Sequence, residues 1–226
     1  MNLLHKLAEK PWLAQTEGGD AALLEDSGPR LPAKTALKFF IAVVSVIFFL
    51  FTITFLSRSQ YPDFQALAGE PWLPLSNTGQ LWFNSALLVL ASAGLELARR
   101  QAGRQPLGAV VLALGAAAVC SVGFVIGQYL VWLQLSDRGY TVSANPANSY
   151  FYLLTAIHAL HLLGGLFALA RLIYRFAERP NLASLQQNIG LCALYWHYLL
   201  LLWLFLFALL VAPAETYRAI AAFCGL

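Results

Sequence analysis

The stretch SYFYLLTAIHALHLLGGLFALARL, Ser149–Leu172, decides how this chain folds. It carries no charged side chain before Arg171, and it is longer than the roughly 20 residues that a helix needs to cross about 30 Å of hydrocarbon. Backbone polar groups in lipid must bond within their own segment, so the stretch predicts a membrane-spanning helix. Two histidines, His158 and His161, interrupt the apolar run three residues apart, and they pose the functional question.

The composition of the whole chain favours the same solvent. Apolar residues make up 59% of the 226 residues and charged residues only 11%, whereas a soluble domain carries about 25% charged residues. No segments of alternating hydrophobicity indicate a β-barrel. The sequence therefore predicts an all-α integral membrane bundle of five spans, Ala36–Leu56, Leu81–Ala98, Leu107–Trp132, Ser149–Leu172 and Ile189–Val211.

The remaining segments divide the chain into three parts. Residues 1–33 hold charges and prolines instead of a basic start followed by an apolar core, so we expect a cytoplasmic arm and no cleaved signal peptide. Residues 34–213 form the five-helix membrane domain, and residues 214–226 form a short periplasmic tail.

The positive charges indicate the orientation. Eleven of the 14 Lys and Arg residues lie on one face, which comprises the N-terminal side up to the start of the first span and the ends of the second and fourth spans with the loops that follow them. Short loops rich in Lys and Arg stay in the cytoplasm, so the N-terminus is expected inside and the C-terminus outside. No clustered basic tract predicts binding to nucleic acid.

Three histidines lie inside the predicted spans, and polar residues there are candidates for function. His158, His161 and His197 allow a metal or haem site, a proton relay, or hydrogen bonds between helices. A metal site usually recruits further ligands, and a relay usually contains acids. No Asp or Glu lies in the interior of any span, and Cys120 and Cys192 have no metal-site spacing. Helix-bracing hydrogen bonds are therefore favoured, and no metal or catalytic residue is expected in this chain.

Small residues indicate close helix packing. Gly123 and Gly127 form a GxxxG pair, and Gly164 and Gly165 follow the two histidines of the fourth span. Glycines let helix backbones approach closely in lipid, where no hydrophobic force drives association.

Four motifs, in order along the chain, resemble subunit III of haem–copper oxidases, in its bacterial five-helix form. PLSNTGQLWFNSALLVLASAGLELA is similar to the family's Pro-x-x-Asn-Thr start of a helix, and GQYLVWLQL resembles the end of the next helix. SYFYLLTAIHALHLLGGLFALARL resembles its most recognisable helix, and YWHYLLLLWLFLFALL its last. The resemblance covers about residues 36–212.

The resemblance implies a non-catalytic subunit of a respiratory terminal oxidase in the bacterial inner membrane. It implies partners, the catalytic subunit I and subunit II, which hold the haem and copper, and a bound phospholipid. It also implies support of proton uptake by the complex and a V-shaped, two-plus-three arrangement of the helices. The residues then expected at a lipid cleft or a subunit interface are His158, His161, Trp196, His197 and Gln128.

Three departures from the family pattern concern acids. Val44, Val131 and Leu200 stand near positions where the family commonly has a carboxylate. These changes put a carboxylate-linked proton role in doubt and leave an accessory subunit of a nitric oxide reductase complex as an alternative. A stand-alone haem-binding membrane cytochrome is a further alternative, and so is a small transporter, although no inverted repeat supports the latter.

Overall fold

The computed structural model describes residues 33–67, 74–75, 78–102, 107–178 and 182–225. The predicted arm, residues 1–33, lies outside them except for its last residue. The chain divides into two compact units, Met1–Ala36 and Leu37–Leu226. The second unit contains all the described residues except Ala33–Ala36.

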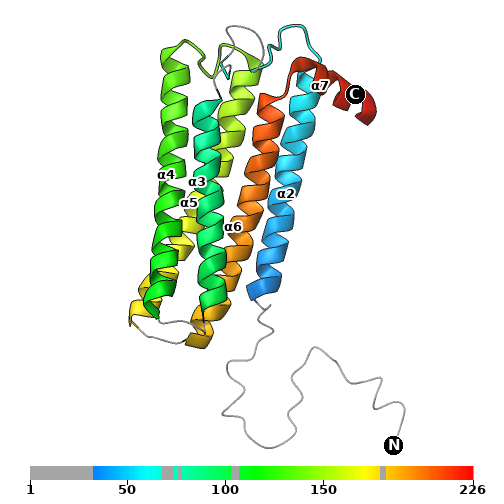
Figure 1. Cartoon of the computed structure of the whole chain (residues 1–226). Coiled ribbons are helices and arrows are strands. Elements are labelled where there is room, and N and C mark those ends of the chain that lie inside the picture. Colours follow the sequence, from blue (N-terminus) through cyan, green and yellow to red (C-terminus); the bar gives the residue numbers. More distant parts are fainter. Residues whose placement is uncertain (1–32, 68–73, 76–77, 103–106, 179–181, 226) are drawn as a thin grey trace, which may run out of the picture. The chain divides into compact units, whose positions relative to one another are not determined.

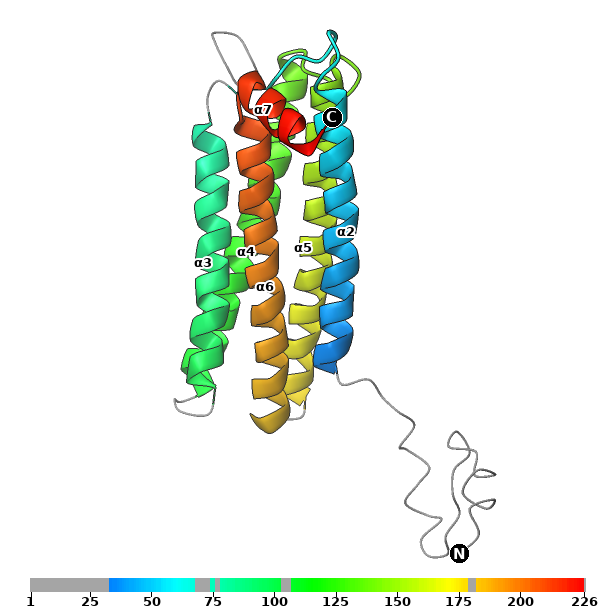
Figure 2. The ribbon, with the colours of Figure 1, turned by 90° about the vertical axis from the view of Figure 1, so that its right-hand side faces the viewer.

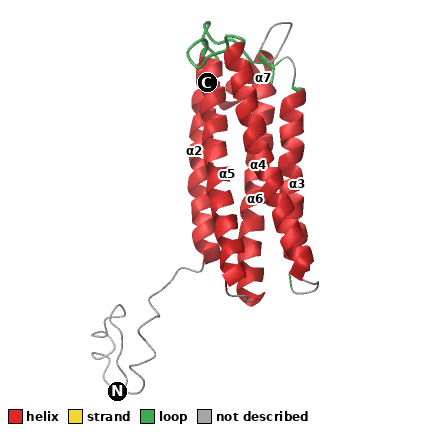
Figure 3. Cartoon of the chain, turned by 90° about the vertical axis from the view of Figure 1, so that its left-hand side faces the viewer, coloured by secondary structure: helices red, strands yellow, loops and turns green. Residues whose placement is uncertain are grey.

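All regular structure in the described residues is helical (Figure 3). Within these residues, five helices are long and apolar enough to cross a membrane, and they confirm the five predicted spans and the all-α fold class. The helices are α2 (Ala33–Arg58), α3 (Gly79–Gln101), α4 (Leu107–Asp137), α5 (Pro146–Glu178), α6 (Leu182–Val211) and the short α7 (Ala214–Cys224) (Figure 1). All five helices extend beyond the predicted ends, because polar and charged residues next to the apolar runs also adopt helical backbone.

Four helices pack closely as a ring, which we call the four-helix group: α3 contacts α4, α4 contacts α5, α5 contacts α6, and α6 contacts α3. Small residues permit the closest of these approaches. A Cβ added at Gly94 of α3 would lie 3.3 Å from the Ala113 carbonyl oxygen and 3.3 Å from the Ala117 Cβ of α4. Alanine and glycine therefore bring α3 and α4 together, as is usual for helices in lipid.

Helix α2 lies outside the four-helix group and has no close backbone approach to it. Figure 2 shows α2 and α3 at opposite edges of the bundle. By close backbone approach the described spans therefore group as four plus one, and side chains join α2 to α5 and α6. The α2 phenylalanines that face the neighbouring helices are bulky, and their rings separate the α2 backbone from the other backbones; they are Phe40, Phe48, Phe51 and Phe55.

Hydrogen bonds from tryptophans brace the four-helix group. The Trp203 indole of α6 donates to Ser85 Oγ of α3 at 2.8 Å, and the Trp196 indole of α6 donates to Ser121 Oγ of α4 at 2.9 Å. Both rings are buried. Because α4 and α6 do not approach closely by backbone, Trp196 spans the centre of the group.

The connections at the α7 end of the bundle are tied together by Asn145 (Figure 1). Its side-chain oxygen accepts from the Ala147 backbone N–H at 3.2 Å, which caps α5 ahead of Pro146. The same amide exchanges two hydrogen bonds with the backbone of Gln65, in the segment that follows α2. The start of α5 is thereby attached to the end of α2.

We expect Ser121→Ala to lower the free energy of unfolding by about 1–2 kcal/mol, because the buried Trp196 indole loses its acceptor. Ser85→Ala should act similarly through Trp203. Unfolding of the purified chain in mixed detergent micelles measures the effect. Ser136→Ala, at an exposed position of α4, is the matched control. Equal stability of the Ser121 and Ser136 variants would contradict the bracing role.

The two adjacent glycines of α5 should respond differently to alanine. A Cβ at Gly165 would lie 3.0 Å from the rings of Trp196 and Tyr195, whereas a Cβ at Gly164 would meet nothing within 4 Å. Alanine gains roughly 0.5–1 kcal/mol over glycine in a helix, but overpacking costs about 1–3 kcal/mol. Gly165→Ala should therefore lower the melting temperature and Gly164→Ala should leave it unchanged or raise it. Identical shifts would refute the close contact.

Candidate functional site

The three intramembrane histidines occupy three different environments. His158 is fully buried between the Phe124 ring of α4, 5.7 Å away, and the Trp203 ring of α6, 5.3 Å away, measured between ring centroids. Neither of its ring nitrogens has a hydrogen-bond partner among the described residues. His158 therefore fills space as an aromatic ring inside the four-helix group.

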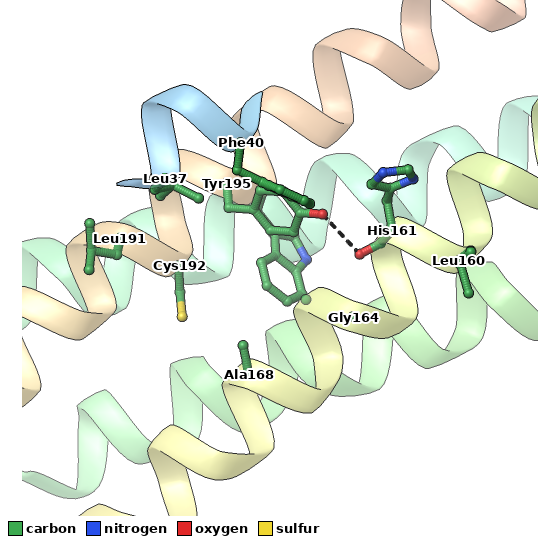
Figure 4. Close-up of a pocket in the computed structure, with 11 residues that line it drawn as sticks. Leu37, Phe40, Leu160, His161, Gly164, Ala168, Leu191, Cys192 and Tyr195 are labelled. Atoms are coloured by element: carbon green, nitrogen blue, oxygen red, sulfur yellow. Dashed lines mark hydrogen bonds between the residues drawn. The ribbon is translucent and has the colours of Figure 1, made fainter. Parts of the chain in front are cut away.

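His161 connects α5 to α2. Its Nδ1 lies 2.8 Å from the Ile157 carbonyl oxygen, so Nδ1 carries the proton and donates, because a carbonyl can only accept. Its ring packs against Phe40 and Phe48 of α2 at centroid distances of 6.1 and 5.9 Å. The His161 carbonyl also accepts from the Tyr195 hydroxyl of α6 at 3.1 Å (Figure 4). His161 of α5 thus contacts both α2 and α6.

His197 joins α6 to α3. Its Nδ1 lies 2.5 Å from Ser92 Oγ, and its Nε2 lies 3.4 Å from the Glu96 carboxylate. Glu96 is also bound by Arg99 and Arg100, at 2.7 Å each. Two guanidinium groups therefore hold the Glu96 carboxylate near the end of α3. Of the three histidines, His197 makes a side-chain hydrogen bond to another helix, which is the kind of contact favoured by the sequence.

The structure does not bring these histidines into one ligand set. Within the described ranges, no group of three or more His, Cys, Asp or Glu side chains lies close enough to hold a metal ion. A haem held by His197 with His158 or His161 would need imidazoles that face one another. Instead, His197 faces α3, while His161 faces α2 and His158 is enclosed by Phe124 and Trp203.

Gln128 lies in the interior, on the face of α4 that meets α5. Phe124 contacts His158, and Trp132 donates to Thr155 Oγ1 at 3.1 Å. Gln128 is four residues from each, so it shares their face. Its side-chain amide is buried without a hydrogen-bond partner among the described residues. Gln128 and His158 are therefore interior groups of the four-helix group and do not line the groove described next.

A groove of about 600 Å³ lies between α2, α5 and α6 (Figure 4). Its walls are almost entirely apolar, and His161 and Trp196 are the two predicted cleft residues that line it. Leu37 and Phe40 form the α2 wall, opposite the α5 stripe of Leu160, Gly164, Gly165 and Ala168 and the α6 residues Leu191, Cys192 and Tyr195. The groove is open because α2 stands apart from the four-helix group. An apolar cavity of this size accepts a hydrocarbon chain.

The glycines named from the sequence have distinct surroundings. Gly164 borders the groove, and Gly165 contacts Trp196. A Cβ at Gly127 would collide with the Asn84 amide of α3, whereas one at Gly123 would make ordinary contact with Leu87 at 3.4 Å. Gly94 was not predicted as a packing residue, because no second glycine at GxxxG spacing marks it. Of these glycines it is nevertheless the one whose added Cβ would meet the backbone of another helix, at Ala113 of α4.

The three positions at which the resemblance led us to expect an acid, Val44, Val131 and Leu200, lie in apolar surroundings. Val44 and Val131 are 2% and 3% exposed, and Leu200 is half-buried against the core. A carboxylate at a buried position needs hydrogen-bond partners or a counter-charge. The valines need neither, and they pack with the surrounding apolar side chains.

Comparison with known proteins places these features in a family. The family model described as cytochrome c oxidase subunit III matches residues 32–212. A probable cytochrome c oxidase subunit 3 of Nocardia farcinica is 32% identical over 85 residues, which are 38% of this chain and 42% of that protein. This match spans less than half of the relative's length.

Two further relatives extend the comparison. Cytochrome c oxidase subunit 3 of Thermostichus vulcanus is 33% identical over 89 residues, 38% of this chain and 42% of the relative. That of Synechocystis sp. is 28% identical over 183 residues, 80% of this chain and 75% of the relative. The match to the family model runs through all five apolar helices, so this is a multi-pass membrane protein. The chain belongs to the cytochrome c oxidase subunit III family.

Proposed function

We propose that this chain is the non-catalytic subunit III of a respiratory haem–copper terminal oxidase. The observation that carries the proposal is the match to the subunit III family model across residues 32–212, which includes every membrane-spanning helix. In the proposed complex, subunits I and II hold haem and copper and transfer electrons to oxygen, and this chain stabilises the catalytic subunit. The complex lies in the bacterial inner membrane, with the N-terminal side of α2 in the cytoplasm and α7 in the periplasm.

The groove between α2, α5 and α6 supports a role in binding phospholipid. Gly164 and Ala168 line the groove on α5, and Arg171 and Arg175 follow at helical spacings of three and seven residues from Ala168. Both arginines are exposed. An acyl chain lying in the groove therefore places its phosphate at the level of two guanidinium groups, which bind phosphate well.

Support of proton uptake is proposed to be indirect. The carboxylates within the described spans are Glu96 and Asp137, both near helix ends. Glu96 is already bound by Arg99, Arg100 and His197. A relay needs groups that exchange protons in sequence along the membrane normal, so the contribution of this chain is to hold lipid and protein around the proton-conducting subunit.

Purification of the tagged chain in mild detergent tests the assignment to an oxidase. We expect partner subunits containing haem and copper to co-purify, and the chain separated from them to show no Soret band. A Soret band stoichiometric with the isolated chain would instead establish a haem-binding cytochrome. Co-purification with subunits that reduce nitric oxide and not oxygen would favour the nitric oxide reductase alternative.

Filling the groove tests the lipid proposal. Gly164→Leu places an isobutyl group in the groove, since a Cβ there meets nothing within 4 Å. We expect the variant complex to lose a bound phospholipid, measured by mass spectrometry, and to inactivate after fewer turnovers. Gly190→Leu is the matched control, because Gly190 also borders open space but lies outside the groove lining. Unchanged lipid content in the Gly164 variant would exclude the groove as the lipid site.

A further inference from the structure

Helix α7, Ala214–Cys224, follows the last membrane span and lies beyond the residues that match the family model. Only Ala212 and Pro213 separate it from the end of α6 at Val211. The apolar span Leu185–Val211 contains 27 residues, which is about 40 Å of helix at 1.5 Å per residue, compared with about 30 Å of hydrocarbon. The end of α6 therefore reaches the headgroup layer, and α7 begins there.

Tyr217 fixes the orientation of α7 on the bundle. Its hydroxyl donates to the Leu209 carbonyl of α6 at 2.8 Å. Its ring meets the edges of Phe55, at the end of α2, and Phe64, in the following segment, at centroid distances of 5.2 and 6.2 Å. Burial raises the pKa of the Tyr217 phenol, so the hydroxyl stays a neutral donor. Ala221, one turn later, is buried on the same face.

The two flanks of α7 differ in chemistry. At about 100° per residue, Ile220 and Phe223 lie to one side of Tyr217, and Arg218 and Glu215 lie to the other. Phe223 is 93% exposed and Ile220 is 38% exposed, and both charged residues are exposed as well. Of the described helices, α7 separates apolar from polar side chains most strongly.

We propose that α7 is an interfacial membrane helix whose Ile220–Phe223 flank enters the lipid surface while its Glu215–Arg218 flank faces water. Amphipathic helices of this kind bury their apolar side about 5–10 Å below the headgroup boundary. Lipid is the partner because only two residues separate α7 from a membrane span. The contacts of Tyr217 with Leu209 and Phe55 fix the rotation of α7 about its axis, and hence the directions in which its apolar and charged flanks point. Gly225, with φ +74°, ends the helix two residues after Phe223. This inference does not depend on the oxidase assignment.

Nitroxide accessibility tests the proposal on the tagged chain, purified with whatever subunits accompany it and reconstituted in phosphatidylcholine vesicles. In a chain with Cys120, Cys192 and Cys224 replaced by alanine, a spin label is attached at Phe223→Cys, and at Arg218→Cys as the matched control on the opposite flank. Oxygen concentrates in the bilayer, whereas a nickel chelate stays in water. We expect the ratio of oxygen to nickel accessibility to be several-fold higher at 223 than at 218.

Two outcomes would overturn the proposal. Equal ratios at 223 and 218 would mean that the apolar flank faces water. Shielding of position 223 from both reagents would mean that another protein surface covers it. Ile220→Cys gives an independent position on the same flank if the 223 variant does not assemble, and it must show the same excess of oxygen over nickel accessibility.

Discussion

The hydrogen bond from the Trp196 indole to Ser121 crosses the centre of the four-helix group, and the positions of the surrounding residues follow from it. In lipid, an unpaired indole N–H finds no water, so the serine on α4 fixes the rotamer of a large ring on α6. That ring closes over Gly165 of α5, which is the reason the position has no side chain. The neighbouring Tyr195 then reaches the carbonyl of His161. One donor and acceptor pair thus determines the floor of the groove.

The five spans could be predicted from the sequence because length and apolarity are local properties. Residues 214–226 were expected only as a short tail, whereas Ala214–Cys224 form helix α7 with Tyr217, Ile220, Ala221 and Phe223 at helical spacing. That spacing, followed by a glycine at position 225 where a helix can end, was the signal in the sequence for a short amphipathic helix. The grouping of the helices was not predictable in this way, because it depends on which side chains meet across α2.

The histidines show the same limit. The sequence indicated hydrogen bonding between helices, and His197 does this with Ser92, a residue 105 positions earlier. Nothing near His197 identifies that partner. His158 is surrounded instead by Phe124 and Trp203, and His161 by the rings of α2. Identical side chains, two of them three residues apart, take different roles because a helix turns about 100° per residue and presents them to different neighbours.

The attachment of α2 has a mechanical consequence. Among the described residues, ring contacts and one hydroxyl contact, between Ser45 and Tyr198, connect α2 to its neighbours along the span. The end of α2 is tied through Phe55 to Tyr217. A helix held by side-chain contacts, with no close backbone approach to its neighbours, can tilt without breaking any backbone packing. A membrane span tilts to match the thickness of the hydrocarbon around it. The thickness of the bilayer and the saturation of its acyl chains would then set the distance between α2 and α5, and with it the width of the groove.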